Sequence, residues 1–155
     1  MNRTIAIACG VDTSEFEVSL RSAQGIYSFI DKEKYTLYIV EMHGLDWHVQ
    51  LPDGTKAPVD RNDFSFRLGV EKVVFDFVYI TIHGTPGEDG RLQGYLDMLH
   101  IPYSCCGVLA AALTYDKFAC NQYLKAFGVR IADSLLLRQG QSVSVEDGIG
   151  KIGLP

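Results

Sequence analysis

The residues with the clearest chemical potential lie in the segment His83 to Gly90, which reads HGTPGEDG. This segment follows an apolar run, Val78 to Ile82, that predicts a buried strand, and precedes an amphipathic run, Leu92 to Leu99, that predicts a helix. A glycine-rich passage from a strand into a helix exposes backbone N–H groups at the positive end of the helix dipole. With His83 at its start, the segment predicts a binding site for a small anion such as a carboxylate or a phosphate.

A second group of polar residues surrounds Glu15. Ser14 and Glu17 have the spacing of a capping box at the start of a helix, and Glu17 and Arg21 have the spacing of an ion pair on its surface. This pattern gives Glu15, at the first helical position, no role of its own. Glu15 either stabilises the positive end of the helix dipole or binds the ammonium group of a substrate, and the residues leave both interpretations open.

Four further polar residues have competing interpretations. His83 is either a loop histidine bonded to the backbone or part of the anion site. Lys117 is either a solvated lysine or a cation for a nucleotide phosphate held by a neighbouring domain. Glu88 and Asp89 are predicted to be structural acids at a helix start, because Thr85 to Glu88 also fits a capping box.

The elements that position these residues alternate between strand and helix. Apolar runs predict strands at Ile5–Cys9 and Tyr35–Val40, with an amphipathic helix over Val18–Ile30 between them. This order predicts a right-handed βαβ unit, a parallel sheet and an α/β fold. A third core strand is expected over Phe75–Ile82 and a short fourth over Ile101–Ser104. Ligands bind at the carboxyl ends of such strands, so the loops after the first and third strands are expected to face one crevice.

Two regions depart from this alternation. Between residues 43 and 69, Trp47–Leu51 and Thr55–Val59 flank an Asp-Gly turn and predict a small hairpin, interpreted as an insertion that leaves the main sheet. Val108–Phe127 predicts one long helix. The segment from residue 132 to residue 155 is partly extended and partly polar, and is expected to open a second domain.

Composition narrows the class of protein. A chain of 155 residues is about one domain, and its net charge of −5 without a basic run argues against nucleic acid or an anionic membrane as a partner. No apolar run is long enough to span a bilayer, and the first residues lack a signal-peptide core. Four cysteines without a disulfide framework predict reduced thiols and a cytoplasmic location.

Four stretches together resemble one family: Ser14–Leu20, His83–Gly94, Ile101–Tyr103 and Ala110–Lys117. In order and spacing they are similar to the N-terminal region of D-alanine–D-alanine ligases, ATP-grasp enzymes of peptidoglycan precursor synthesis. The resemblance covers essentially the whole chain, but the family proteins are about twice as long. It implies a three-layer, Rossmann-like pre-ATP-grasp domain with a parallel sheet over residues 1–131. Residues 132–155 would then begin a truncated central ATP-grasp domain.

The resemblance also implies an activity and residue roles. The family phosphorylates the carboxylate of one D-alanine with ATP and Mg²⁺, and the amine of a second D-alanine attacks the acyl phosphate. Glu15 would be both catalytic and substrate-binding, anchoring the ammonium group of the first D-alanine. Val18, His83 and Gly84 would surround the same amino acid, and Lys117 would reach the ATP phosphates. No metal ligand is expected in this chain, which alone should be inactive, and the family suggests a homodimer.

One departure from the family pattern leaves an alternative open. The family has two successive glycines after the first strand, and here the second is replaced by Val11. A β-branched residue resists positive φ and close backbone approach, so the substrate loop is either rearranged or altered in specificity. The alternatives are a non-catalytic α/β module that binds an amino acid or forms a dimer, and an ATP-grasp ligase for a different acid.

Overall fold

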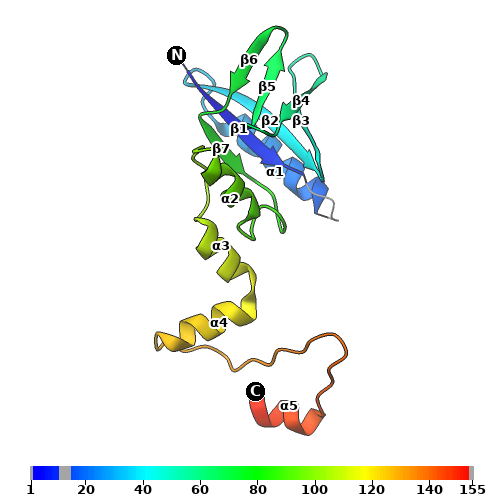
Figure 1. Ribbon diagram of the computed structural model, residues 1–155, viewed down its shortest axis with the longest axis vertical. Helices are drawn as coiled ribbons and strands as arrows, with labels where there is room; N and C mark the ends of the chain where they lie inside the picture. Colours follow the sequence, from blue (N-terminus) through cyan, green and yellow to red (C-terminus); the bar gives the residue numbers. More distant parts are fainter. Residues whose placement is uncertain (1, 11–14, 154–155) are drawn as a thin grey trace. The chain divides into compact units, whose positions relative to one another are not determined.

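The computed structural model describes residues 2–10 and 15–153 of the chain. The chain divides into two compact units, Met1–Ala111 and Ala112–Pro155, and each is described by itself. The first unit contains the β-sheet and the helices that cover it (Figure 1). The boundary expected near residue 131 is a boundary between the domains of the family, whereas the two units are defined by contacts within this chain. The expected boundary therefore stays a prediction.

The first unit is built around a parallel βαβ core, as predicted. Strand β1 (Arg3–Cys9) is followed by helix α1 (Phe16–Phe29) and strand β2 (Tyr35–His43). Strand β1 lies between β2 and β7 (Phe77–Ile80) and pairs with both in parallel. Because parallel strands of this kind are covered on both faces, their sequences are continuous apolar runs rather than alternating ones.

The predicted hairpin is present as β3 (Asp46–Gln50) and β4 (Lys56–Asp60). The expectation that it leaves the main sheet is wrong. Strand β2 continues past Val40 to His43, and β3 pairs with this extension in antiparallel register. The hairpin therefore extends the sheet directly from the end of β2.

A second hairpin, which the sequence pattern did not predict, completes the sheet. It consists of β5 (Ser65–Leu68) and β6 (Glu71–Val74), and β5 pairs with β4. The described residues thus form one seven-stranded mixed sheet with the order β6-β5-β4-β3-β2-β1-β7. The charged residues of the second hairpin hide its strand signal in the sequence. They are present because only one face of this hairpin joins the core.

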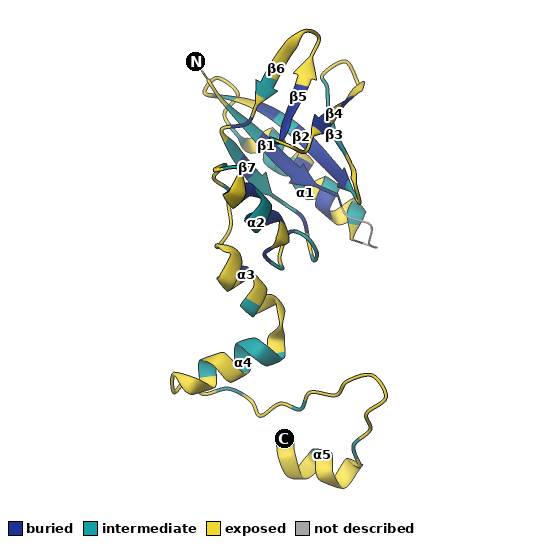
Figure 2. Cartoon of the chain, viewed as in Figure 1, coloured by how far each residue is buried: buried dark blue, intermediate teal, exposed yellow. Residues whose placement is uncertain are grey.

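Helices cover the two faces of the parallel strands and produce a three-layer arrangement. Helix α1 packs on one face, where Ile7, Cys9 and Ala23 form a small buried cluster. Helix α2 (Arg91–Met98) belongs to the larger core on the other face. Figure 2 shows the buried residues concentrated along the central strands. Successive residues of β1 alternate between the two clusters, as the pleat of a strand requires.

The fourth strand is reduced to one β-bridge, between Tyr103 and Val78. Val78 donates its N–H to the carbonyl of Pro102 at 2.9 Å and accepts one from Ser104 at 3.1 Å. The next strand donor, the N–H of Ile80, bonds instead to the hydroxyl of Ser104 at 3.0 Å. The side-chain hydroxyl takes the place of a backbone acceptor, so the expected strand over Ile101–Ser104 does not form a ladder.

The expected long helix over Val108–Phe127 is two helices, α3 (Val108–Tyr115) and α4 (Lys117–Ala126). Asp116 interrupts them in an extended conformation, and its carboxylate accepts the N–H of Ala119 at 2.9 Å. An aspartate that caps a helix in this way favours a new start over continuation.

The second unit also contains a helix in the polar, glycine-containing segment, where the sequence pattern did not predict one. Helix α5 (Val145–Ile152) begins at Ser144, whose hydroxyl accepts the N–H of Asp147 at 3.0 Å. Two glycines within α5 concealed it in the sequence, because glycine is a poor helix former. Across the described parts of both units, no helix has the length and apolar character needed to cross a membrane.

Candidate functional site

The loop after β1 leaves the sheet through Gly10. This residue has a φ of +100°, and a Cβ at its position would lie 2.7 Å from the carbonyl oxygen of Met42. Both observations require glycine there. The next residues, including Val11 and the predicted cap Ser14, lie outside the described residues, so the predictions for them stay open.

Glu15 stands at the entrance to α1, immediately before its first helical residue. The side chain is exposed, and the carbonyl accepts the N–H of Ser19 at 3.0 Å, which closes the first helical turn. Val18 lies within this first turn, with 53% of its surface exposed. The predicted surface pair between Glu17 and Arg21 is confirmed at 3.6 Å.

A polar cluster joins this helix to the end of β7. The hydroxyl of Ser19, which is fully buried, accepts the N–H of Gly10 at 3.1 Å and donates to the carbonyl of Thr81 at 3.0 Å. The hydroxyl of Thr81 lies 3.0 Å from the carbonyl oxygen of Ala8 and 3.3 Å from that of Ser19. The loops after the first and third strands therefore share one set of hydrogen bonds, which agrees with the expectation that they face the same edge.

The glycine-rich loop is closed by its own acids. The N–H of Gly84 donates to the Glu88 carboxylate at 2.7 Å, and the N–H of Glu88 donates to the carbonyl of Gly84 at 2.8 Å. The capping box expected over Thr85–Glu88 is therefore wrong, since α2 begins at Arg91 with Gly90 before it. The N–H of Gly84 is therefore already bonded within the loop. This argues against the prediction that the backbone N–H groups of this loop are open to an anion.

Asp89 stabilises the start of α2, as predicted for an acid at this place. Its carboxylate accepts the hydroxyl of Thr85 at 2.8 Å and the N–H of Arg91 at 3.2 Å. The Arg91 side chain returns to the same carboxylate at 3.3 Å. The carboxylates of Glu88 and Asp89 thus help to hold the loop in shape.

An open groove of about 340 Å³ runs along this edge of the first unit. Its walls come from α1, from the end of β7, from the glycine-rich loop and from the segment after the β-bridge; they include Ser22, Ile26, Thr81, His83, Glu88 and Cys105. Val18 lies one helical turn before Ser22, whose hydroxyl donates to the carbonyl of Val18 at 2.9 Å. The α1 wall of the groove, Ser22 and Ile26, therefore lies about two and three helical turns beyond Glu15.

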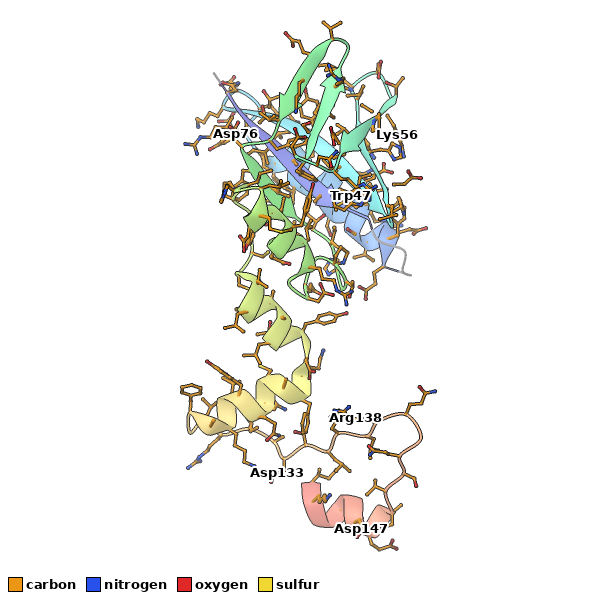
Figure 3. The ribbon with its side chains drawn as sticks, viewed as in Figure 1. Trp47, Lys56, Asp76, Asp133, Arg138 and Asp147 are labelled. Atoms are coloured by element: carbon orange, nitrogen blue, oxygen red, sulfur yellow. The ribbon has the colours of Figure 1, made fainter. Side chains whose placement is uncertain are left out.

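A buried carboxylate that the sequence reasoning missed lies at the same end of the sheet. Glu41 is 6% exposed and sits opposite Cys9 in the β1–β2 register. Lys56 of β4, which Figure 3 labels, donates to the Glu41 carboxylate at 2.7 Å, and Gln50 also donates to it. Burial alone raises the pKa of Glu41, but the hydrogen bonds from Lys56 and Gln50 outweigh it and hold that pKa below its usual value.

The four cysteines form no disulfide within the described residues, and their reduced state stays a prediction. Burial raises the pKa of the Cys9 thiol to about 12, and the nearby Glu41 carboxylate adds to the shift. Burial also raises the pKa of Cys105 in the groove. Neither thiol is therefore an activated nucleophile, since nucleophilic cysteines need a lowered pKa.

Lys117 is the first residue of α4 and is exposed. It belongs to the second unit, so its predicted contact with ATP phosphates stays a prediction. Among the described residues, no group of three or more histidine, cysteine, aspartate or glutamate side chains could hold a metal ion.

The fold and the two loops define an α/β domain with a candidate ligand site at one edge of its sheet, and comparison with known proteins assigns its family. Residues 4–106 match the family model described as "D-ala D-ala ligase N-terminus". The chain belongs to this family. It is 84% identical over all 155 residues to a D-alanine–D-alanine ligase of Bacteroides thetaiotaomicron and 81% identical to one of Bacteroides fragilis. It spans 48% of the length of each, about half of these relatives.

Solved structures agree with this assignment. The D-alanyl-alanine synthetase A of Vibrio cholerae superposes with a TM-score of 0.81 at 29% identity, over 96% of this chain and 45% of that one. A Bacillus anthracis D-alanine–D-alanine ligase complexed with ATP gives 0.69 at 26% identity, over 96% and 45%. The VanG D-Ala:D-Ser ligase of Enterococcus faecalis gives 0.74 at 25% identity, over 85% and 44%.

Proposed function

We propose that this chain is the N-terminal part of an ATP-dependent D-alanine–D-alanine ligase that serves peptidoglycan synthesis. The observation that carries the proposal is the 84% identity over the whole chain to a protein named for this activity. At such identity, the substrate-facing residues of one protein are the best guide to those of the other. The finer features of the proposal, including a cytoplasmic location and a homodimer, follow from the same family membership.

The first D-alanine is proposed to bind between the start of α1 and the glycine-rich loop. Its ammonium group would bind Glu15, whose exposed carboxylate stands at the helix entrance. Val18 would contact the methyl group, and His83 with Gly84 would border the opposite side. D-alanine carries one positive and one negative charge at neutral pH, so a site with an acid at one lip and a histidine at the other suits it.

The reaction would proceed in two steps. ATP supplies a phosphoryl group to the carboxylate of the first D-alanine, and the amine of the second D-alanine then displaces the phosphate. The protein's part in such transfers is to align the reactants and neutralise charge. The exposed ammonium of Lys117 suits a contact with the ATP phosphates. We place the Mg²⁺ ligands outside these 155 residues, which on this proposal have no ligase activity alone.

The test is a pair of variants in the full-length protein that carries this chain. Formation of D-alanyl-D-alanine and of ADP is measured for the parent protein, for Glu15→Gln and for Glu17→Gln. The neutral amide keeps the size of Glu15 but removes the charge that binds the ammonium group. We expect kcat/KM for D-alanine to fall about 100-fold or more in Glu15→Gln, the loss seen when a charged hydrogen-bond partner is removed.

Glu17→Gln is the matched control, because Glu17 lies two residues away on the exposed surface and forms an exposed ion pair with Arg21. It should retain the parent activity. A parent protein that binds D-alanine without forming the dipeptide would support the alternative of a non-catalytic amino-acid-binding module. A parent protein that neither binds nor ligates D-alanine would contradict the proposal.

A second candidate function is ligation of D-alanine to a different acceptor. The observation in its favour is the match to the VanG ligase, named for D-Ala:D-Ser activity. Val11, in place of the usual glycine, is a further reason to examine specificity. Competition between D-alanine and D-serine as acceptors, read as the ratio of the two dipeptide products, separates this function from the first.

A further inference from the structure

Two hydroxyl groups that have no assigned role connect the two sides of the proposed substrate site. They belong to Ser19, which is fully buried in α1, and to Thr81, which follows β7. We call this pair and its backbone partners, the N–H of Gly10 and the carbonyl of Ala8, the hydroxyl tie. Each hydroxyl bonds to the backbone of the other residue, so the connection is reciprocal.

The tie stands next to the residues proposed to hold D-alanine. Ser19 directly follows Val18, and its N–H bonds to the carbonyl of Glu15 at 3.0 Å. Thr81 is two residues before His83 and lines the same groove. One end of the tie therefore fixes the entrance of α1, and the other fixes the start of the glycine-rich loop.

We propose that Ser19 and Thr81 are positioning residues that set the separation between Glu15 and His83, and with it the affinity for the first D-alanine. This inference rests on the proposed function. Neither hydroxyl touches the substrate, and each acts through the backbone it holds. Catalytic geometry tolerates only displacements well under an ångström. A site of this kind therefore requires hydrogen bonds, such as those of the hydroxyl tie, that hold its two sides at a fixed separation.

Loss of a hydroxyl changes the tie in a definite way. In Ser19→Ala, the N–H of Gly10 and the carbonyl of Thr81 lose their partner in a buried place. Buried groups without partners are costly, so the loops move apart until water reaches them. Thr81→Val keeps the shape of the side chain and removes only its hydrogen bonds, whereas Thr81→Ser keeps the hydroxyl.

The experiment measures steady-state kinetics of the full-length protein, with the two D-alanine sites fitted separately. We expect Ser19→Ala and Thr81→Val to raise the KM for the first D-alanine about tenfold or more, as small misplacements of catalytic groups do. The KM for ATP should stay unchanged, and Thr81→Ser should restore the parent values. Ser28→Ala is the control, since its exposed hydroxyl donates to the carbonyl of Gly25 within α1.

Each outcome decides the inference. A first-site KM unchanged in folded Ser19→Ala or Thr81→Val, in an otherwise active protein, overturns the positioning role and leaves the proposed function intact. An equal rise in the KM for ATP shows a general structural role and also overturns it. If Ser19→Ala does not fold, the comparison of Thr81→Val with Thr81→Ser decides. A parent protein without ligase activity defeats the proposed function and this inference together.

Discussion

The two halves of the sheet are stabilised in different ways. In the parallel half, made of β1, β2, β7 and α1, the cluster under α1 is largely aliphatic, and buried polar bonds such as that between Gly10 and Ser19 lie at the ends of the strands. The antiparallel half, made of β3 to β6, contributes the large aromatic side chains of Trp47 and Phe66 to the core cluster. The ring centroid of Phe66 lies 4.8 Å from that of Tyr38 in β2, and the ring centroid of Trp47, which Figure 3 labels, lies 5.4 Å from that of Tyr95 in α2.

This difference separates positioning from bulk stability. Hydrogen bonds have strict geometry, so the parallel half can hold loops in place for a ligand. Aromatic packing contributes more free energy but tolerates more variation in shape. Substitutions in the antiparallel half should therefore reduce stability first, and those in the parallel half should alter the site.

The largest effect should come from Phe66→Ala in the antiparallel half. Phe66 is 1% exposed and contacts two other aromatic rings, so its removal leaves a cavity. We expect the free energy of unfolding of the full-length protein to fall by about 3–5 kcal/mol. Denaturant unfolding measures this loss. The KM for D-alanine, determined where the variant is folded, should stay near the parent value; a large rise there would show that the two halves are not separable.

The next effect should come from Gly10→Ala in the parallel half. The added methyl group would meet the Met42 carbonyl at 2.7 Å, and the φ of +100° disfavours any side chain. Strain and overpacking together should cost about 3 kcal/mol. Because Gly10 begins the loop that leads to Glu15, D-alanine binding should weaken as well. Calorimetric titration with D-alanine checks this, and unchanged affinity would show that the loop does not depend on Gly10.

A smaller, pH-dependent effect should arise at Glu41, where the two halves meet. Its folded-state pKa is lowered, so its ionised form is favoured by folding. The stability it contributes is present above the unfolded value of 4.5 and is lost as pH falls through the folded value. Glu41→Gln should remove about 1–2 kcal/mol near neutral pH.

The measurement is unfolding as a function of pH from 7 downward, which should show a flatter acid limb in Glu41→Gln than in the parent. Asp31→Asn is the control. Asp31 also has a lowered pKa, held down by Lys34, but this pair is exposed. Exposed pairs contribute little, so the control should follow the parent profile. Equal flattening in both variants would contradict a special role for the buried pair.

The smallest effect should be a gain in stability from Gly25→Ala. This glycine lies inside α1, and a Cβ there would meet nothing within 4 Å. Alanine in a helix interior is favoured over glycine by about 1 kcal/mol. Compared with Gly10→Ala, the variant shows that glycine is required at the loop and not throughout the parallel half. A melting temperature below the parent value would sink that distinction.

Much of the fold was predictable because its signals are local. The apolar runs at β1, β2 and β7 and the amphipathic α1 identified the parallel core, and the Asp-Gly turn identified the first hairpin. The second hairpin was missed, since Arg67, Glu71 and Lys72 interrupt the apolar pattern. The division of the long helix was missed because a cap inside an apolar run looks like an ordinary helical residue.

The candidate site was predictable in its residue types but not in its bonds. The segment His83–Gly90 indicated the site. However, the N–H of Gly84, which was expected to be available to an anionic ligand, donates to the Glu88 carboxylate of the same loop. Glu41 gave a weak signal, an acid near the end of an apolar strand. Ser19 gave none, because a serine on a helix is ordinary until its partner is known.

By itself, the sequence determined the family, the parallel core and the two loops that carry Glu15 and His83. These depend on residue type and short-range spacing, which the chain displays directly. Only the tertiary structure decided that the hairpins extend the main sheet and that Ser19 bonds to Thr81, 62 residues away. A hydrogen bond between distant residues exists only once the sheet has brought their strands and helix together, so no local pattern can encode it.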